Sequence, residues 1–222
     1  MKERVMMITP HPDDETLGCG GSLLQHRDNN DDIQWVIFTD MSEDYSAVLR
    51  NNREEEIKRA AEEYQFSKLH KLNFPAASLD ETELKEMISG VADIFQQEQP
   101  TTIYLPYRYD THTDHCRVYD AVMACTKWFR FPSIKSVLAY ETLSETNFSH
   151  DPAVNGFHPN VFKNITPYLD KKIEIMNIYE SEIKPHPFPR SDKAIRSLAY
   201  LRGSASGFEA AEAFMLIKER RE

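Results

Sequence analysis

The chain has 222 residues, of which 41% are hydrophobic and 28% are charged, and its formal net charge is -10 at pH 7. This length supports a sizeable buried core, and the acidic balance argues against nonspecific nucleic-acid binding, which needs a basic face. No stretch approaches the roughly 18 apolar residues of a membrane span, and the N-terminal apolar run is too short for a signal peptide. Three cysteines without a C-x-x-C pair favour a reducing compartment. We therefore expect a cytoplasmic enzyme or binding protein with no membrane span and no nucleic-acid partner.

The first two thirds of the chain alternate strand and helix patterns. Short apolar runs bounded by polar residues, Gly or Pro predict five strands, at 4–9, 33–40, 68–74, 101–106 and 134–140. Helical spacing follows the second strand at Ile57, Ala60, Ala61 and Tyr64, and follows the fourth at Val118, Ala121, Val122 and Cys125. This alternation predicts an α/β fold with a Rossmann-like, mostly parallel sheet and helices on both of its faces.

The last third of the chain has a different pattern. An irregular stretch is followed by a predicted short strand at 161–165 and by helical patterns at 167–182, 192–201 and 208–218. We expect one domain over 1–222, in which 1–141 forms the sheet core. Residues 142–222 then supply loops and helices that pack on the sheet and wall the site.

The stretch "PHPDDETLGCGG" at 10–21 follows the first predicted strand and allows two interpretations. Its glycines could cradle a phosphate, as in a nucleotide-binding module without metal, but the last glycine of G-x-G-x-x-G is missing. Two aspartates in the turn would also repel a pyrophosphate. Gly20 and Gly21 share one helical stripe, so we expect them to let this helix press close to the sheet.

The alternative interpretation is a metal site built from two turns. His11 and Asp14 supply two ligands, and the third candidate lies in "YDTHTDHCRVYDA" after the fourth strand. In the common doubly wound strand order, the first and fourth strands are neighbours at the switch point, where ligands bind. His115 lies on the inward stripe of the following helix and is the expected third ligand, whereas His112 lies in the turn and can face a substrate.

"HPDDE" after the first strand and "HTDH" after the fourth resemble the zinc-dependent LmbE/PIG-L de-N-acetylases, over nearly the whole chain. The resemblance implies a hydrolase that removes the N-acetyl group from an N-acetylglucosamine-type amino sugar or conjugate, and releases acetate. It implies Asp13 as general base and His112 as an electrostatic or acid partner oriented by Asp114. The implied metal ligands are His11, Asp14 and His115. Thr113 departs from the proline that is more usual in the second motif.

The metal and the lesser residues leave alternatives open. Zn²⁺ is expected, but Fe²⁺ accepts the same two-His, one-carboxylate set, which also occurs in Fe(II) oxygen chemistry. Arg53, in an R-x-x-E pattern, either grips a substrate group or pairs with Glu56. Glu15 either orients a ligand or is a solvated first-turn acid. Weaker candidates are Arg202, Asp40 and Asp44 for substrate contact, Tyr107 and Tyr109 for the pocket or the core, His150, His158 and His186 as loop histidines, and Cys19, Cys116 and Cys125 as buried small residues. The expected partner is a small N-acetyl amino sugar, and a homo-oligomer is left open.

Overall fold

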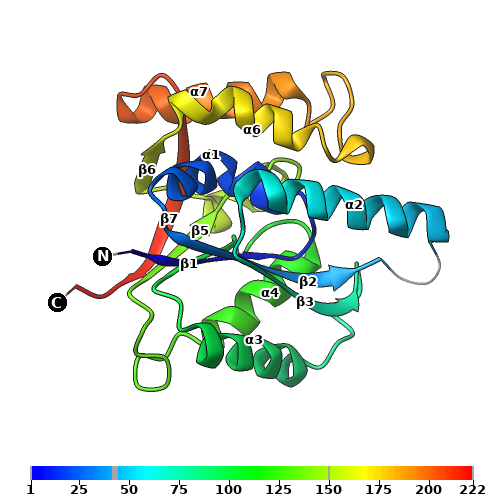
Figure 1. Cartoon of the computed structure of the whole chain (residues 1–222). Coiled ribbons are helices and arrows are strands. Elements are labelled where there is room, and N and C mark those ends of the chain that lie inside the picture. The colour runs from blue at the N-terminus through cyan, green and yellow to red at the C-terminus, as the bar shows by residue number, and fades with distance from the viewer. Residues whose placement is uncertain (1, 42–44, 150, 222) are drawn as a thin grey trace.

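A computed structural model describes residues 2–41, 45–149 and 151–221 of the chain. Its described strands form a seven-stranded sheet in the order β3-β2-β1-β4-β5-β7-β6 (Figure 1). Short 3-10 turns occur at Thr146–Phe148, Thr166–Tyr168 and Glu180–Glu182. The longer elements, in chain order, are β1 (Arg4–Thr9), α1 (Asp14–Asp28), β2 (Asp32–Asp40), α2 (Ala47–Tyr64), β3 (Lys68–Pro75), α3 (Leu84–Glu98), β4 (Thr102–Pro106), α4 (Thr113–Ala124), β5 (Ser136–Tyr140), α5 (Pro152–Asn155), β6 (Val161–Asn164), α6 (Leu169–Met176), α7 (Asp192–Ser206) and β7 (Ala211–Glu219).

The expected mostly parallel sheet is confirmed, and its switch point lies where expected. β1 pairs in parallel with both β2 and β4, so the carboxyl ends of β1 and β4 are side by side. β5 continues the parallel set beside β4, whereas β7 runs antiparallel to both β5 and β6. The five strands predicted in the first two thirds all form, with boundaries within two residues of those expected.

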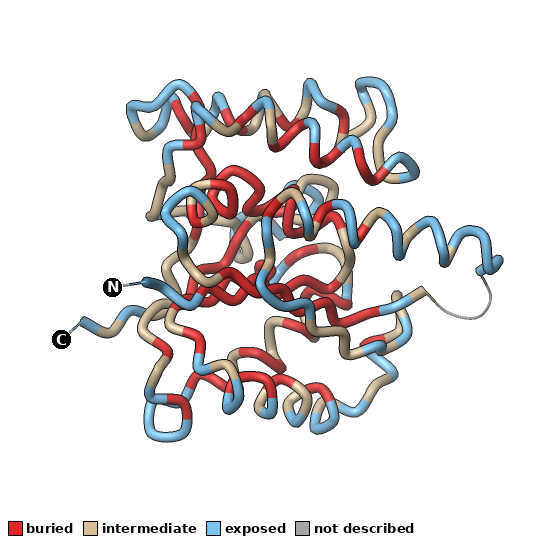
Figure 2. Tube along the Cα trace, viewed as in Figure 1, coloured by how far each residue is buried: buried red, intermediate tan, exposed pale blue. Residues whose placement is uncertain are grey.

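The sheet separates the two larger hydrophobic clusters of the core, and a third, small cluster lies in the C-terminal layer. On one face, α3 and α4 pack through Met87, Val91 and Val118 against Ile8 and Phe38 of the central strands. On the other face, α1 and α2 pack on the sheet, and α6 and α7 cover α1 as a further layer (Figure 1). The most completely buried segments are therefore the central strands and α1, as Figure 2 shows in red.

The glycines of α1 serve close packing on both sides of the helix. A Cβ on Gly18 would lie 2.3 Å from the Tyr140 ring of β5. Gly20 and Gly21 were expected to face the sheet, but they face the outer layer. A Cβ on Gly20 would lie 2.9 Å from Lys172 Cγ, and a Cβ on Gly21 would lie 2.5 Å from Ile165 Cβ. The reason is the C-terminal layer, which encloses α1 from outside. All three glycines lie within α1 and none of them lines the pocket at the carboxyl ends of β1 and β4, so within the described residues they do not form the phosphate-binding loop of a nucleotide-binding module.

The last third of the chain departs from its prediction at one element. The predicted helix at 208–218 is wrong, because Ala211–Glu219 forms β7 between β5 and β6. Residues 142–222 thus complete the sheet as well as cover it. The predicted strand at 161–165 is β6, the pattern at 167–182 contains α6, and the helix predicted at 192–201 is the first part of α7, which continues to Ser206. No helix in the described ranges is long and apolar enough to cross a bilayer.

Candidate metal centre and its pocket

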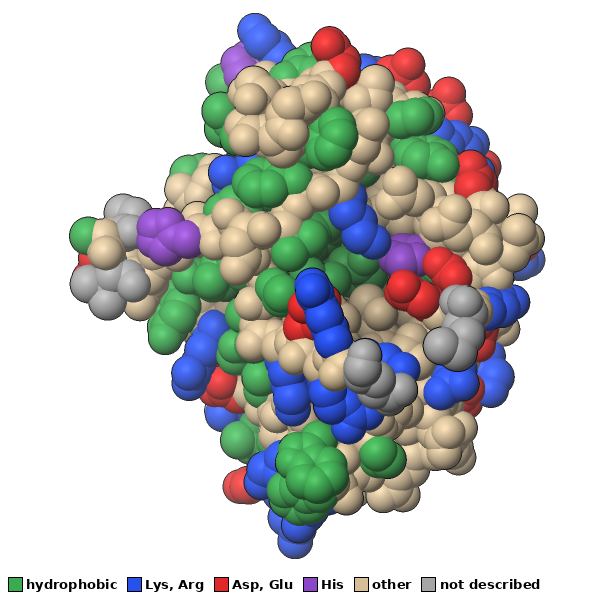
Figure 3. Space-filling view, turned by 90° about the vertical axis from the view of Figure 1, so that its left-hand side faces the viewer, with side chains coloured by type: hydrophobic (Ala, Val, Ile, Leu, Met, Phe, Trp, Pro, Cys, Tyr) green, Lys and Arg blue, Asp and Glu red, His purple; other side chains and the backbone are tan. Residues whose placement is uncertain are grey.

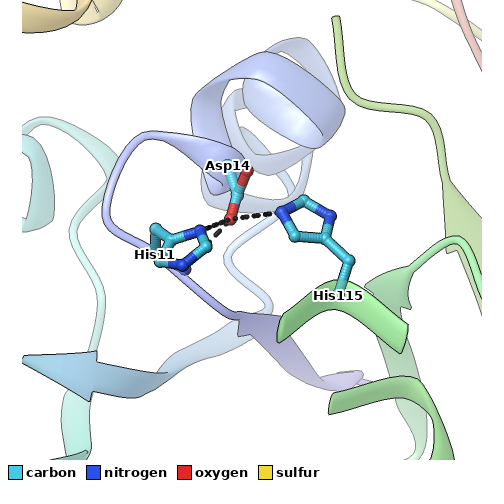
Figure 4. A group of neighbouring side chains, drawn as sticks. All are labelled: His11, Asp14 and His115. Atoms are coloured by element: carbon cyan, nitrogen blue, oxygen red, sulfur yellow. Dashed lines mark hydrogen bonds and ion pairs between the residues drawn. The ribbon is translucent and has the colours of Figure 1, made fainter. Parts of the chain in front are cut away.

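The two predicted turns meet at the carboxyl ends of β1 and β4. His11 and Asp14 come from the turn that opens α1, and His115 comes from the first turn of α4 (Figure 4). Asp14 Oδ2 lies 3.6 Å from His11 Nδ1 and 3.5 Å from His115 Nε2. One ligand atom from each of the three lies within 4.8 Å of the others, as a shared metal ion requires. The expected ligand set is therefore brought together from turns about 100 residues apart.

The opposite nitrogen of each histidine is engaged by a buried carboxylate. His11 Nε2 lies 2.9 Å from Asp114 Oδ2, and His115 Nδ1 lies 2.8 Å from Asp110 Oδ2. Asp114 also accepts hydrogen bonds from the Ala77 and Leu79 amides, at 2.8 and 3.1 Å. A carboxylate behind a ligating histidine fixes its tautomer and ring orientation and makes it a better ligand. Hence His11 Nδ1 and His115 Nε2 can serve as neutral imidazole ligands.

The electrostatics of this cluster favour a positive charge at its centre. Burial alone would lower the pKa of His11, but hydrogen bonds to Asp114 and Asp14 raise it to about 10. Burial would raise the pKa of Asp14, yet the charges of His115 and His11 lower it to about 2. Two imidazoles and one carboxylate are also a common donor set for Zn²⁺ and Fe²⁺. The residues present therefore fit a divalent metal.

Asp114 contacts His112 through its backbone, while its carboxylate faces His11. The Asp114 backbone N–H donates to His112 Nδ1 at 3.2 Å, and Asp114 Oδ2 lies 2.9 Å from His11 Nε2. Since Nδ1 accepts this bond, the ring proton of neutral His112 is on Nε2. Burial and the charges of His11 and His115 lower the pKa of His112, and the charges of Asp114 and Asp14 act against them, so the neutral imidazole is favoured. His112 also serves as the N-cap of α4.

Asp13 has a strained backbone and a buried carboxylate. Its φ of 113° lies in the region that favours glycine, and such strain at a non-glycine residue concentrates at functional sites. Within the described residues its side chain makes no capping hydrogen bond to α1, so it is not merely a helix cap. Instead, Oδ2 accepts from Arg190 Nη1 at 3.1 Å. Burial and the Asp14 charge raise the pKa of Asp13, and the Arg190 charge acts against them.

Glu15 stabilises this turn through buried hydrogen bonds. Its carboxylate is fully buried and accepts hydrogen bonds from the Asp13 amide at 2.9 Å, the Thr16 hydroxyl at 2.6 Å and the Tyr179 hydroxyl at 2.8 Å. Burial raises the pKa of Glu15 to about 7. The interpretation of Glu15 as a solvated acid is therefore wrong, and its contacts hold the backbone that presents Asp13.

The two turns line a pocket of about 310 Å³ through His11, Asp13, Asp14, His112 and His115, together with groups from five other segments. Arg53 lines it from α2, and its Nε lies 3.4 Å from Glu56, so the predicted pair with Glu56 forms while contact with a substrate stays a prediction. Arg190 and Glu182 line it from the C-terminal segment, and their side chains pair at 3.2 Å. Sequence reasoning missed both of these, and it missed Asp110, although Asp110 lies inside the second quoted motif.

The weaker candidates are mostly outside the pocket. Asp40 lines it at the end of β2, whereas Arg202 forms a bidentate pair with Glu141 elsewhere. Tyr107 is buried and its hydroxyl donates to the Gly156 carbonyl at 2.9 Å, so it belongs to the core. Tyr109 packs on that ring. His158 and His186 are exposed. The three cysteines are free thiols, of which Cys19 and Cys125 are buried and Cys116 is half-buried. Asp44 and His150 lie outside the described residues.

The fold and the His–Asp–His cluster together define an α/β protein with a metal-type centre at its switch point. The chain belongs to the PIG-L (GlcNAc-PI de-N-acetylase) family, whose sequence profile matches residues 6–126, more than half of its length. The resemblance drawn from the two motifs is thereby confirmed.

Relatives extend the match to the whole chain. It is 25% identical to diacetylchitobiose deacetylase of Thermococcus kodakarensis, over 97% of this chain and 83% of that protein. Among solved structures, the N,N'-diacetylchitobiose deacetylase of Pyrococcus horikoshii superposes with a TM-score of 0.77 at 21% identity, over 97% and 84% of the two chains. GalB, the 4-carboxy-2-hydroxymuconate hydratase of Pseudomonas putida KT2440, superposes with a TM-score of 0.73 at 18% identity, over 100% and 98%. Because the same fold also serves a hydratase, function must be argued from the site.

Proposed function

We propose that this protein is a metal-dependent deacetylase that hydrolyses the N-acetyl group of an N-acetylglucosamine-type sugar or conjugate and releases acetate. The observation that supports this most strongly is the His11–Asp14–His115 group, in which each histidine is backed by a buried carboxylate. The Asp13 carboxylate lines the same pocket and is the candidate base. Membership of a deacetylase family supports the reaction class.

The metal would be held by His11 Nδ1, Asp14 Oδ2 and His115 Nε2. When bound, a divalent cation at such a site lowers the pKa of coordinated water and polarises a carbonyl oxygen. Zn²⁺ is the metal we propose, and Fe²⁺ accepts the same ligands. A cytoplasmic location remains a prediction made from the sequence.

The chain's own residues divide the proton transfers between them. Asp13 keeps one carboxylate oxygen on Arg190 and uses the other to take the proton of the attacking water and pass it to the leaving amine. His112, neutral with its proton on Nε2, donates a hydrogen bond to the oxygen that becomes negative. Arg53, at the pocket wall, binds a substrate hydroxyl or anionic group.

Metal content and acetate release, measured on the same preparations, test this proposal. The wild-type protein, purified anaerobically without chelator, is expected to contain about one zinc or iron ion per chain and to release acetate from N,N'-diacetylchitobiose or N-acetylglucosamine. His115→Ala is expected to lose both. Asp13→Ala is expected to keep the metal and to lose turnover by at least about 10²-fold.

His158→Ala provides the matched control, since this histidine is exposed and lies outside the pocket lining. It should match the wild type in metal and in turnover. If Asp13→Ala also lost the metal, the division of roles would be wrong. If the wild type took up no metal even when zinc was offered, the hydrolase proposal would fall.

A further inference from the structure

An exposed aromatic turn projects from the end of the sheet opposite the pocket. We call residues 127–130 the aromatic turn; it follows α4 and precedes β5, at the lower left of Figure 1. Trp128 and Phe129 each leave 63% of their surface in solvent, and their rings meet edge to face with centroids 6.1 Å apart. The two rings therefore form one exposed aromatic patch at this tip.

Backbone hydrogen bonds and the packing of Phe131 hold the aromatic turn in place. The Arg130 and Phe131 amides both donate to the Lys127 carbonyl, at 2.9 and 3.0 Å. Phe131 is buried and packs edge to face on Phe95 of α3, with centroids 5.9 Å apart. The exposure of Trp128 and Phe129 is therefore fixed by an ordered turn, and both rings are presented at once.

Cations surround this tip, although the protein as a whole is acidic. Lys127 and Arg130 flank the two rings, and the Arg130 guanidinium lies 6.0 Å from the centre of the Phe129 ring. From β7 and the residue after it, Lys218 donates to the Thr126 carbonyl and Arg220 donates to the Pro132 carbonyl. Glu219, beside Lys218, pairs with Arg221 at 2.8 Å. Figure 3 shows this tip at the bottom of the view, where hydrophobic side chains lie among Lys and Arg.

We propose that the aromatic turn docks the protein on an anionic phospholipid surface. Aromatic rings sit favourably at the headgroup level of a bilayer, and Lys and Arg near an anionic leaflet add attraction that salt screens. The combination of two rings and four cations at one tip matches both requirements. A chain with a net charge of -10 would otherwise be repelled by such a surface.

Docking by this turn would leave the pocket accessible. The pocket opens at the carboxyl ends of β1 and β4, and the aromatic turn lies at the other end of the sheet, where β5 begins. A docked molecule therefore turns its pocket away from the lipid, toward substrate in water. Lipid binding and catalysis are then separable, and this inference stands whether or not the proposed function is correct.

Tryptophan fluorescence reports on this contact directly. The chain has two tryptophans, and Trp35 is fully buried, with its Nε1 donating to Thr9 Oγ1 at 2.9 Å. Any blue shift or quenching by brominated lipid therefore comes from Trp128. We expect a saturable blue shift with vesicles of phosphatidylcholine containing phosphatidylserine, at least about tenfold weaker apparent affinity for phosphatidylcholine alone, and weakening by added salt.

A pair of charge-reversal variants separates the local patch from net charge. Lys127→Glu/Arg130→Glu should lower partitioning onto phosphatidylserine vesicles at least about tenfold in co-sedimentation. Lys58→Glu/Arg59→Glu makes the same charge change at two exposed residues of α2 and should bind as the wild type does. Trp128→Ser/Phe129→Ser should also fail to co-sediment while unfolding at the wild-type temperature.

Three results would overturn the inference. They are no shift of Trp128 fluorescence on phosphatidylserine vesicles, equal binding to phosphatidylcholine alone, and equal loss of binding in the Lys58→Glu/Arg59→Glu control. A blue shift that grows with protein concentration without lipid, together with a doubled mass in light scattering, would instead assign the turn to a second copy of the chain.

Discussion

Arg190 reaches the Asp13 carboxylate from 177 residues further along the chain. Its guanidinium is fixed on two more sides, by Glu182 at 3.2 Å and by the Phe188 ring at 5.6 Å. Hydrogen bonds between charged groups are the strong ones, and an arginine fork also fixes direction. Asp14 and burial both oppose a charge on Asp13, and Arg190 acts against them while it fixes the direction of this carboxylate.

Replacing Arg190 should therefore impair turnover more than substrate binding. We expect Arg190→Ala to lower kcat at least about tenfold with a smaller change in KM, because the loss falls on Asp13. Arg190→Lys should retain part of the activity, and guanidinium ion should restore part of it to Arg190→Ala. Steady-state kinetics of acetate release check this.

Arg196→Ala is the matched control, since Arg196 lies nearby in α7 but pairs with Asp170 and Asp192 at the surface. It should leave both constants unchanged. A loss confined to KM in Arg190→Ala, without rescue by guanidinium, would show that Arg190 binds substrate and does not position Asp13.

The sequence predicts that His11, Asp14 and His115 come together because two independent signals agree on them. A dense motif marks His11 and Asp14, and the strand order brings the turn of His115 to the same edge. Arg190 and Glu182 have no such signal. Their place at the pocket depends on how an irregular, proline-rich segment packs against the first turn, which no local periodicity encodes.

Helix α1 is confined between the sheet and the C-terminal layer, and this explains its glycines. A Cβ at Gly21 would lie 2.5 Å from both Cβ and Cγ2 of Ile165, which is fully buried. Those atoms are close to the backbone and cannot rotate away. The cost of glycine in a helix, about 1 kcal/mol, is therefore offset by the close approach of the two layers.

Gly21→Ala should destabilise the protein, although alanine is the better helix former. Overpacking a close contact costs about 1–3 kcal/mol of unfolding free energy, which exceeds the gain in helix propensity. Gly90→Ala in α3 is the matched control, because its Cβ would meet only the Leu72 side chain, with the flexible end nearest at 2.9 Å. Urea unfolding should show Gly90→Ala neutral or stabilised, and equal effects in both variants would contradict the packing explanation.

Strand β7 shows why the last element was predicted as a helix. Its sequence is rich in Ala, Glu, Met and Leu, which are good helix formers, and it lacks an alternating pattern. The alternation is missing because Ala211, Ala213 and Phe214 are buried along with Glu212, inside the sheet. A strand buried on both faces has no period of two, so tertiary context overrides local propensity here.

Across the whole molecule, Glu212 connects the sheet, α1 and the outer layer. From β7 it accepts hydrogen bonds from the amides of Gly21 and Ser22, both at 2.8 Å, and from the Ser22 hydroxyl at 2.6 Å. Lys172 of α6 donates to the same carboxylate at 2.7 Å and to the Leu17 carbonyl at 2.9 Å. Both charged residues are buried, so each depends on the other for compensation.

Replacing one partner of the Lys172–Glu212 pair should lower the free energy of unfolding more than replacing both partners together. Lys172→Met leaves a buried carboxylate and Glu212→Gln leaves a buried ammonium group, so each should lose about 3–5 kcal/mol of unfolding free energy. The double variant should lose less than the sum of the two, because no unpaired charge remains. Lys171→Met, next in sequence, breaks surface pairs with Glu63 and Glu174 and should cost under about 1 kcal/mol. A double-mutant cycle in urea measures the coupling, and strictly additive losses would mean that Lys172 and Glu212 stabilise the three layers independently of each other.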